Sequence, residues 1–171
     1  LPYIDIEDIW IRRELPDTLL IDVAECGTPL AVVQDGSAWL VSPKGKIVEQ
    51  LPAARAGDYA VIDGCELLAP SVGTDIALAT EFANQQTSLL DLLAALDEAG
   101  LTDQVDAIHL EDLSQLTMDY AGRFTVEMAY GADYGLSLRI LEGAVSQLET
   151  NQKGTLRLDP DSTYQVLFTE E

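Results

Sequence analysis

The residues best suited to acid–base or metal chemistry are the single histidine and the two carboxylates that follow it, His109, Glu111 and Asp112. An acid–base pair needs a pocket that holds a substrate, and a metal site needs further ligands. The neighbouring sequence supplies neither. We therefore interpret Glu111 and Asp112 as part of a solvated loop after a strand, and His109 as a half-exposed strand residue.

Other groupings of possible metal ligands also fall short. The acidic segments 5–8 and 159–161 lack the glycine and the distal glutamate of a calcium-binding loop. Cys26 and Cys65, even together with His109, do not reach the roughly four N or S ligands of a structural zinc site. The two cysteines would be free to form a disulfide in an oxidising compartment. We expect no metal and no cofactor.

Motifs for nucleophilic and phosphate chemistry are missing from the sequence. No serine lies in a G-x-S-x-G motif, and Gly64, Gly73 and Gly100 belong to separate turns rather than to one phosphate-binding loop. No nucleophile, base and oxyanion donors can be named together. We expect a non-enzymatic protein with no catalytic residues.

The charge balance narrows the classes of partner. The 171 residues include 30 acidic and 9 basic side chains, which give a net charge of -21. Such a field repels phosphate backbones and anionic lipid surfaces, so we expect no nucleic-acid partner. The acidity either serves solubility or attracts a basic partner surface. No apolar run reaches the roughly 20 residues of a membrane span.

The elements that must position any site begin with a predicted β-hairpin over residues 1–25. Apolar residues alternate with others in 9–12 and in 19–24, and Pro16-Asp17 is a turn signal between them. This alternation predicts one core face and one solvent face. An isolated hairpin is marginal in water, so we expect it to be part of a further domain, with its other elements upstream.

The remaining sequence predicts an α+β domain, in which a mostly antiparallel sheet, arranged as a meander, packs with two main helices. Apolar stripes predict helices over 87–99 and 136–152, the first capped by Thr87 or Ser88 and ended by Gly100, the second ended by Gly154. Residues 52–58 are interpreted as a surface loop. The predicted strands are 29–33, 39–41, 47–48, 59–64, 105–110, 116–120, 124–130, 155–158 and 164–168, with an extended piece at 67–73.

The last predicted strand has the features of a sheet edge. Tyr164, Val166 and Phe168 alternate with Gln165 and Leu167, and the strand contains neither Lys nor Pro. Backbone groups at an edge can pair with another chain. The residues leave two interpretations open: the strand is interior or capped by the acidic end of the chain, or it receives a partner strand by β-augmentation.

Two stretches of the sequence resemble the FtsQ/DivIB family of bacterial cell-division proteins. The segment 12–25, RRELPDTLLIDVAE, is similar to the family pattern basic-x-x-P-x-T-L-x-I-x-V-x-E. Pro29-Leu30-Ala31 and the segment 42–48, SPKGKIV, follow as in the family, with Ser42 where the family often has Asp. The C-terminal helix, turn and strands are the second stretch. The similar order of elements covers essentially the whole chain.

The resemblance implies a domain organisation and a cellular role. Residues 1–25 would be the end of a POTRA domain and residues 26–171 the family's β domain. The rest of the POTRA domain, a transmembrane helix and a short cytoplasmic tail would lie upstream. The family is a non-enzymatic, single-pass scaffold of the divisome in the cell membrane. Its extracytoplasmic part binds FtsB/DivIC-like and FtsL-like proteins at the division septum.

The resemblance also implies where a partner binds. In the family, the partner adds to the last strands of the β domain. The chain has few of the basic residues that the family often has near this surface, so backbone pairing is the contact that we expect. The candidate partner-binding residues in this chain are Leu158, Ser162, Thr163, Tyr164, Val166 and Phe168.

Two functions of other classes make different structural demands. A secreted or membrane-anchored ligand-sensing domain would need a small-molecule pocket of several hundred Å³ with convergent polar groups. A carboxylate-dependent hydrolase would need two buried carboxylates that face each other across a cleft.

Overall fold

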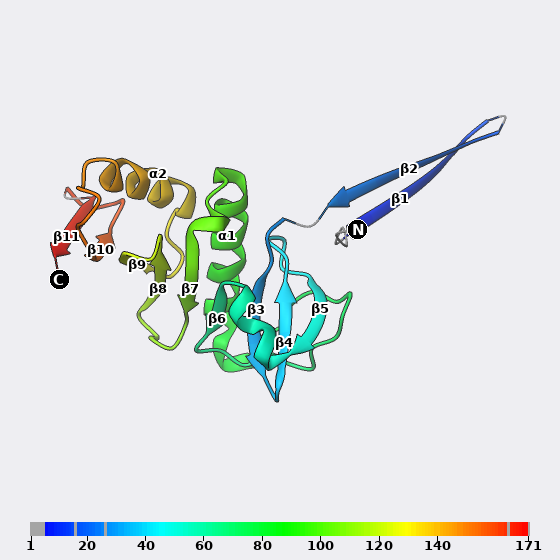
Figure 1. The fold of residues 1–171 in the computed structure, drawn as a ribbon, viewed down its shortest axis with the longest axis horizontal. Coiled ribbons are helices and arrows are strands. Elements are labelled where there is room, and N and C mark those ends of the chain that lie inside the picture. The colour runs from blue at the N-terminus through cyan, green and yellow to red at the C-terminus, as the bar shows by residue number, and fades with distance from the viewer. Residues whose placement is uncertain (1–5, 16, 26, 164, 171) are drawn as a thin grey trace.

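The computed structural model describes residues 6–15, 17–25, 27–163 and 165–170, and its strands form two separate sheets. β1 (Ile6–Glu14) and β2 (Thr18–Glu25) form an antiparallel hairpin that projects from the body of the molecule (Figure 1). The other nine strands form one sheet in the order β11-β10-β9-β8-β7-β6-β3-β4-β5. These strands are β3 (Leu30–Gln34), β4 (Ser37–Val41), β5 (Ile47–Pro52), β6 (Val61–Asp63), β7 (Val105–His109), β8 (Gln115–Tyr120), β9 (Phe124–Ala129), β10 (Gly154–Leu158) and β11 (Val166–Glu170).

The predicted fold class, a mostly antiparallel α+β arrangement, is confirmed. In the described part of the chain, two α-helices and three short 3-10 helices accompany the sheet: α1 (Ala83–Ala99), α2 (Tyr134–Val145), η1 (Ala53–Asp58), η2 (Thr80–Phe82) and η3 (Thr102–Gln104). The meander is incomplete, because β6 pairs in parallel with both β3 and β7, and β10 pairs in parallel with β9. No helix in the described ranges has the length and apolar character needed to cross a membrane.

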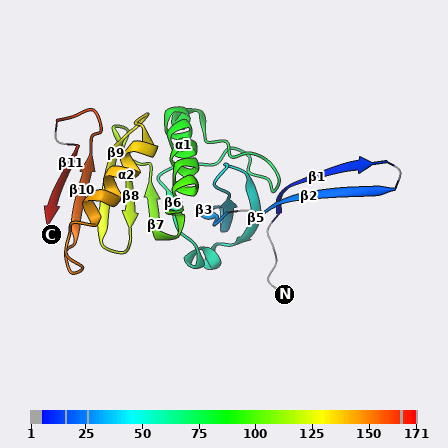
Figure 2. The same ribbon diagram turned by 90° about the horizontal axis from the view of Figure 1, so that it is seen from above.

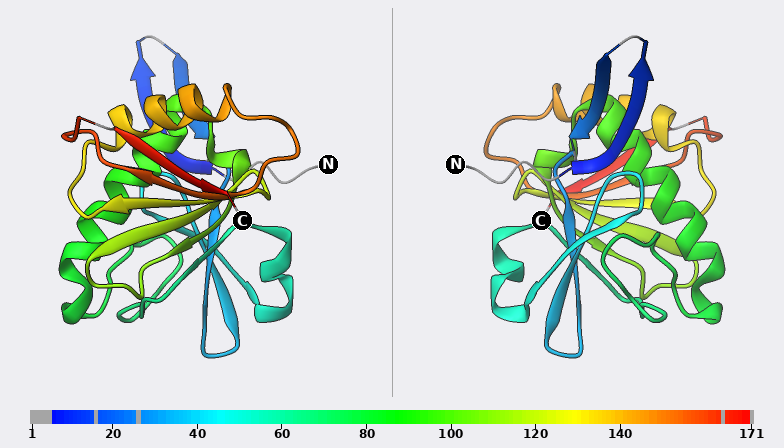
Figure 3. Two further views of the ribbon diagram at one scale, coloured as in Figure 1. Left: turned by 90° about the vertical axis from the view of Figure 1, so that its left-hand side faces the viewer. Right: turned by 90° about the vertical axis from the view of Figure 1, so that its right-hand side faces the viewer.

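The larger core lies between one face of the sheet and the two helices. On β8, β9 and β10 every second side chain is buried, as in Leu116, Met118, Val126 and Leu156. The leucines of α1 and α2 complete this core, and Figure 2 shows both helices on one side of the strands. A smaller core of Ala31, Ala38, Leu40 and Ala56 joins the opposite face of β3 and β4 to η1; Figure 3 shows η1 and α1 on opposite sides. We use the name open face for the side of β7–β11 that is turned away from α1 and α2.

Several predicted boundaries were wrong. Helix α1 begins at Ala83, with Phe82 as its N-cap and no side-chain cap, so neither Thr87 nor Ser88 begins it. Helix α2 ends at Val145, and Gly154 is the first residue of β10 rather than a helix stop. Residues 67–73 form no strand; Leu67 makes only an isolated bridge to Leu78. The predicted loop at 52–58 contains η1.

The apolar face of the N-terminal hairpin is exposed at the side chains that the structure describes. Its predicted core face carries Ile9, Ile11, Leu19 and Ile21, and each of these side chains is more than half exposed. The strands form as predicted, while the predicted turn residue Pro16 lies outside the described residues. The assignment of this hairpin to a POTRA domain stays a prediction.

Candidate interaction edge

The last strand, β11, is an edge of the nine-stranded sheet, so the interpretation of it as an interior strand is wrong. It pairs antiparallel with β10, in a register that places Leu158 opposite Val166, Leu156 opposite Phe168 and Gly154 opposite Glu170. Within the described residues, no strand lies on its other side. Figure 1 shows β11 at the end of the body remote from the hairpin.

The free side of β11 presents an alternating set of backbone groups. The amide N of Asp159 donates to the carbonyl O of Gln165 at 3.0 Å, which continues the β10–β11 ladder. Hydrogen-bonded pairs alternate along an antiparallel ladder, so Gln165, Leu167 and Thr169 turn their backbone groups toward β10. The N–H and C=O groups of Val166, Phe168 and Glu170 therefore point away from the sheet, where a further strand can bond to them.

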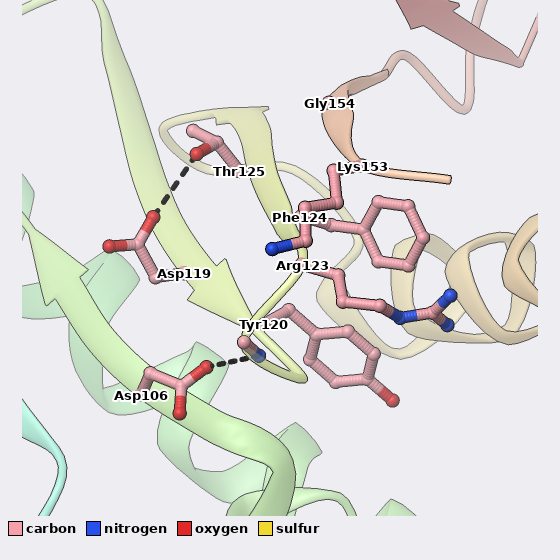
Figure 4. Close-up of a pocket in the computed structure, with 9 residues that line it drawn as sticks. Asp106, Asp119, Tyr120, Arg123, Phe124, Thr125, Lys153 and Gly154 are labelled. Atoms are coloured by element: carbon pink, nitrogen blue, oxygen red, sulfur yellow. Dashed lines mark hydrogen bonds between the residues drawn. The ribbon is translucent and has the colours of Figure 1, made fainter. Parts of the chain in front are cut away.

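Aromatic packing holds β11 in place. The ring of Phe168 meets that of Phe124 edge to face, with 6.3 Å between their centres. The guanidinium of Arg123 lies 4.6 Å from the centre of the Phe124 ring, and its Nη1 donates to the carbonyl O atoms of Glu149 (3.1 Å) and Thr150 (2.8 Å). Figure 4 shows Arg123 and Phe124 beside the start of β10. This stack links the edge strand to the segment after α2.

Gly154 allows β10 and β11 to approach each other closely. Its φ is +151°, and an added Cβ would collide with the carbonyl O of Thr169 and lie 3.0 Å from the Cα of Glu170. Both obstacles belong to the backbone of β11, so a side chain at this position would push the edge strand away.

The open face carries two cross-strand rows that end at β11. One row aligns Thr125, Thr155 and Thr169. The other aligns Glu127, Arg157 and Leu167, and Nε of Arg157 contacts Oε2 of Glu127 at 2.8 Å. Leu167 is 59% exposed at the end of its row. A large apolar side chain thus lies beside the free edge.

Five of the six predicted partner-binding residues are described in the structure and lie on or beside this edge, but they differ in what they can contact. Leu158 is buried, and Val166 and Phe168 are half-buried against the core, so these three mainly support the strand. Ser162 and Thr163 lie in the turn before β11, and the amide of Ser162 donates to the carbonyl O of Asp159. Tyr164 lies outside the described residues. The sequence interpretation missed Leu167, Thr169 and Glu170. The signal for Leu167 and Thr169 was their position on the exposed alternation of the last strand, and the signal for Glu170 was its charge at the end of that strand.

The opposite edge of the sheet, β5, is closed in several ways. The amide of Ile47 donates to the carbonyl O of Thr74 at 2.8 Å, and the amide of Gly73 donates to that of Ile47 at 2.7 Å. The register with β4 shifts between Leu40 and Val41, and β5 ends at Pro52, which has no N–H. Covering loops, bulges and proline are recognised devices against edge pairing.

His109 lies between two carboxylates on the open face rather than beside Glu111 and Asp112. Its Nδ1 is 2.7 Å from Oδ1 of Asp63 on β6, and its Nε2 is 3.2 Å from Oδ2 of Asp119 on β8. Burial disfavours the charged imidazole, but the hydrogen bonds and negative charges of both aspartates outweigh this effect and raise the pKa of His109. With both nitrogens engaged, the ring joins three strands and has no free nitrogen with which to act as a base.

The predicted loop after β7 is observed, and Asp112 has a local role in it. Oδ1 of Asp112 accepts from the amide of Ser114 at 2.7 Å and from its hydroxyl at 2.6 Å. These hydrogen bonds lower the pKa of Asp112. Among the described residues, no group of three or more His, Cys, Asp or Glu side chains could hold a metal ion.

One surface hollow on the open face is lined by polar groups that already form hydrogen bonds within the protein. The hollow in Figure 4 has a volume of about 370 Å³ and is lined by Asp106, Asp119 and Arg123, among others. Asp106 accepts from the amide of Gly122 at 2.6 Å, Asp119 accepts from the hydroxyl of Thr125 at 3.2 Å, and Arg123 is held by carbonyls. These groups do not converge on a ligand, so this hollow does not favour the ligand-sensing alternative.

The described cysteine is not activated. Burial and the charge of Asp63 raise the pKa of the Cys65 thiol to about 11, so the thiolate is scarce at neutral pH. The predicted option of a disulfide involves Cys26, which lies outside the described residues.

No protein-family model matches the chain, and no curated protein matches its sequence significantly.

Proposed function

We propose that this chain is a non-enzymatic interaction scaffold of the bacterial divisome, the extracytoplasmic part of a single-pass membrane protein related to FtsQ/DivIB. In this proposal, an FtsB/DivIC-like partner, itself associated with an FtsL-like protein, adds a strand to β11. The proposal combines the sequence resemblance of the hairpin and meander with the geometry of the last strand.

The single observation that carries the proposal is the contrast between an open β11 and a closed β5 in one sheet. β11 has outward backbone groups at Val166, Phe168 and Glu170, and its contacts with Phe124 already hold it in an extended form. A strand that is ordered before binding loses little conformational entropy when a partner adds to it. Main-chain hydrogen bonds then supply affinity, as in other cases of β-augmentation.

The sharpest test removes one outward N–H and leaves the β10–β11 ladder intact. Val166 is the first residue of β11 and its N–H points away from β10, so proline is tolerated there. We expect Val166→Pro to weaken binding of the extracytoplasmic segment of the FtsB/DivIC-like protein from the same genome by about ten-fold, the loss of roughly one hydrogen bond. Isothermal titration calorimetry gives the affinity.

Val166→Ala is the matched control, because it removes the same apolar contact but keeps the N–H. It should bind nearly as tightly as the unchanged chain, and both variants should keep a cooperative unfolding transition. Equal affinity of Val166→Pro and Val166→Ala would remove β11 as the binding edge. Phe168→Asp is a poorer probe, because Phe168 packs on Phe124 and its loss would disturb the strand itself.

A further inference from the structure

Five cross-strand rows of side chains stop at the free side of β11, and together they define what a neighbouring strand must carry. On the helix side, the rows end in Val166, Phe168 and Glu170. On the open face, they end in Leu167 and Thr169. Directly opposed side chains on neighbouring strands contact each other, so the next strand would meet these five in order.

The helix-side rows require apolar partners at two positions. Val166 and Phe168 continue rows of buried residues, Leu158 and Leu156, yet each remains partly exposed at the edge. Apolar side chains on an added strand would remove that remaining surface from water and extend the core.

The open-face rows require one apolar and one small β-branched partner. Leu167 lies beside Arg157, whose charge is already paired with Glu127 on the far side. An apolar side chain opposite Leu167 would cover the exposed leucine. Thr169 continues the row of Thr125 and Thr155, and threonine and other β-branched residues pair well across strands.

The charges beside β11 favour a basic residue at one end of the added strand. Glu170 ends the helix-side row that runs from Phe124 through Gly154, a residue without a side chain, and it is exposed. Asp159 and Asp161 lie just before the other end of β11, in a chain with a net charge of -21. A cation opposite Glu170 would form a cross-strand pair, and an acid there would be repelled.

We infer that β11 receives, in the antiparallel direction, an extended segment with the order basic, β-branched or hydroxyl, apolar, apolar, apolar, whose basic residue lies opposite Glu170. The antiparallel direction follows from the stronger pairing of antiparallel strands. This inference rests on the proposed function and adds to it the side-chain pattern and orientation of the partner.

The test uses two labelled peptides of identical composition. One contains Lys-Thr-Val-Leu-Val and the other the reverse order, both with Ser-Gly flanks and a fluorescent label, and binding is measured by fluorescence anisotropy. Antiparallel addition matches all five rows only for the first peptide, and parallel addition only for the second. We expect the first to bind about two- to five-fold more tightly, the size of one cross-strand pair.

Charge exchange tests the contact with Glu170 itself. Glu170→Lys should reduce the preference, and a peptide with Glu in place of Lys should then bind the variant more tightly than it binds the unchanged chain. N-methylation of the central valine, whose N–H would face β11, should abolish binding, whereas N-methylation of the threonine, whose N–H faces away, should be tolerated.

The outcomes separate the two proposals. Equal binding of the two peptides, or tighter binding of the reversed one, would overturn the inference and leave strand addition standing. An effect of N-methylation that is the same at both positions would show that the peptides do not add as strands. Absence of binding by either peptide, together with equal partner affinity of Val166→Pro and Val166→Ala, would overturn the proposed function and the inference with it.

Discussion

The two edges of the nine-stranded sheet are built on opposite plans. At β5, a loop covers Ile47 with two hydrogen bonds, a bulge distorts the ladder and Pro52 removes a donor. At β11, the strand is regular, carries the exposed Leu167 and leaves alternate backbone groups outward. An unprotected edge is an aggregation hazard that proteins normally avoid. Protection of β5 but not of β11 is the pattern expected if β11 pairs with a strand of a partner.

The largest expected effect compares a glycine that fits β11 against β10 with a glycine in a free turn. Gly154→Ala would place a Cβ against the Thr169 carbonyl, and we expect it to lower the free energy of unfolding by about 3 kcal/mol. Gly36→Ala, in the β3–β4 turn, also has a positive φ (+76°) but meets nothing within 4 Å. It should cost about 1 kcal/mol. Urea titrations of both variants measure the difference.

Peptide binding is the second measurement on the two glycine variants. Gly154→Ala displaces β11, so it should also abolish binding of the Lys-Thr-Val-Leu-Val peptide, whereas Gly36→Ala should leave that affinity unchanged. Equal stability losses in the two variants would show that β11 is not held against β10 as closely as the structure has it.

The next effect compares two arginines, one near each edge of the sheet. Arg123 stacks on Phe124 and donates to two carbonyls near β11, so Arg123→Ala should lower the free energy of unfolding by about 1–2 kcal/mol. Arg55, in η1 near β5, forms an exposed ion pair with Asp58 at 2.9 Å. Exposed pairs contribute little, so Arg55→Ala should leave the unfolding midpoint unchanged. A reversed order of the two variants would contradict a stabilising role of the Arg123–Phe124 stack.

Local pattern was sufficient to predict β8 and β9, because each alternates strictly between the helix side and the open face. The last strand was predicted over 164–168, and the structure places it at Val166–Glu170. Local alternation does not indicate which strands are neighbours in the sheet. β6 has only three residues, Val61–Asp63, yet it lies between β3 and β7, and α2 carries the chain from β9 to β10 so that these two pair in parallel. Pairing partners depend on how helices pack across the sheet, which periodicity does not encode.

The wrong helix ends and the unpredicted contacts of the histidine have physical causes of the same kind. After Val145, hydroxyl and amide groups of Ser146 and Gln147 bond to the carbonyl O of Gly143 and end α2, although Leu148 still packs on the core. The apolar stripe that predicted a helix over 136–152 therefore extends beyond the end of α2. His109 meets Asp63, which is 46 residues away, only because β6 and β7 become neighbours. The position of the last strand at the end of the chain favoured a sheet edge. The cross-strand neighbours of Leu167 and Glu170 became known only from the register with β10.

A smaller effect concerns the middle of the sheet, where His109 joins β6 to β8 between the two edges. The raised pKa of His109 in the folded state means that its contribution to stability is complete below its unfolded pKa, about 6.5, and is lost as the pH rises through the folded value. We expect a contribution below about 1 kcal/mol, because the ring and both aspartates are partly exposed and water screens the charges.

The matched measurement is the difference in free energy of unfolding between the unchanged chain and His109→Gln, at pH 6 and at pH 9. The difference should be larger at pH 6 and shrink at pH 9, while the other carboxylates cancel in the comparison. A difference that grows with pH would mean that folding holds His109 neutral and lowers its pKa instead of raising it. Peptide affinity at β11 should be the same in both proteins at each pH.

The smallest expected effect comes from the attempt to open the closed edge by one substitution. Pro52→Thr restores an N–H on β5, but the hydrogen bonds of Ile47 with Gly73 and Thr74 and the bulge beside Val41 remain. The edge should therefore stay closed, and calorimetric titration with the Lys-Thr-Val-Leu-Val peptide should give one peptide per chain before and after the change. A rise to two peptides per chain would mean that Pro52 alone keeps β5 from pairing. The difference between the two edges would then depend on one missing donor rather than on the covering loop, and β11 would be open merely because its sequence contains no proline.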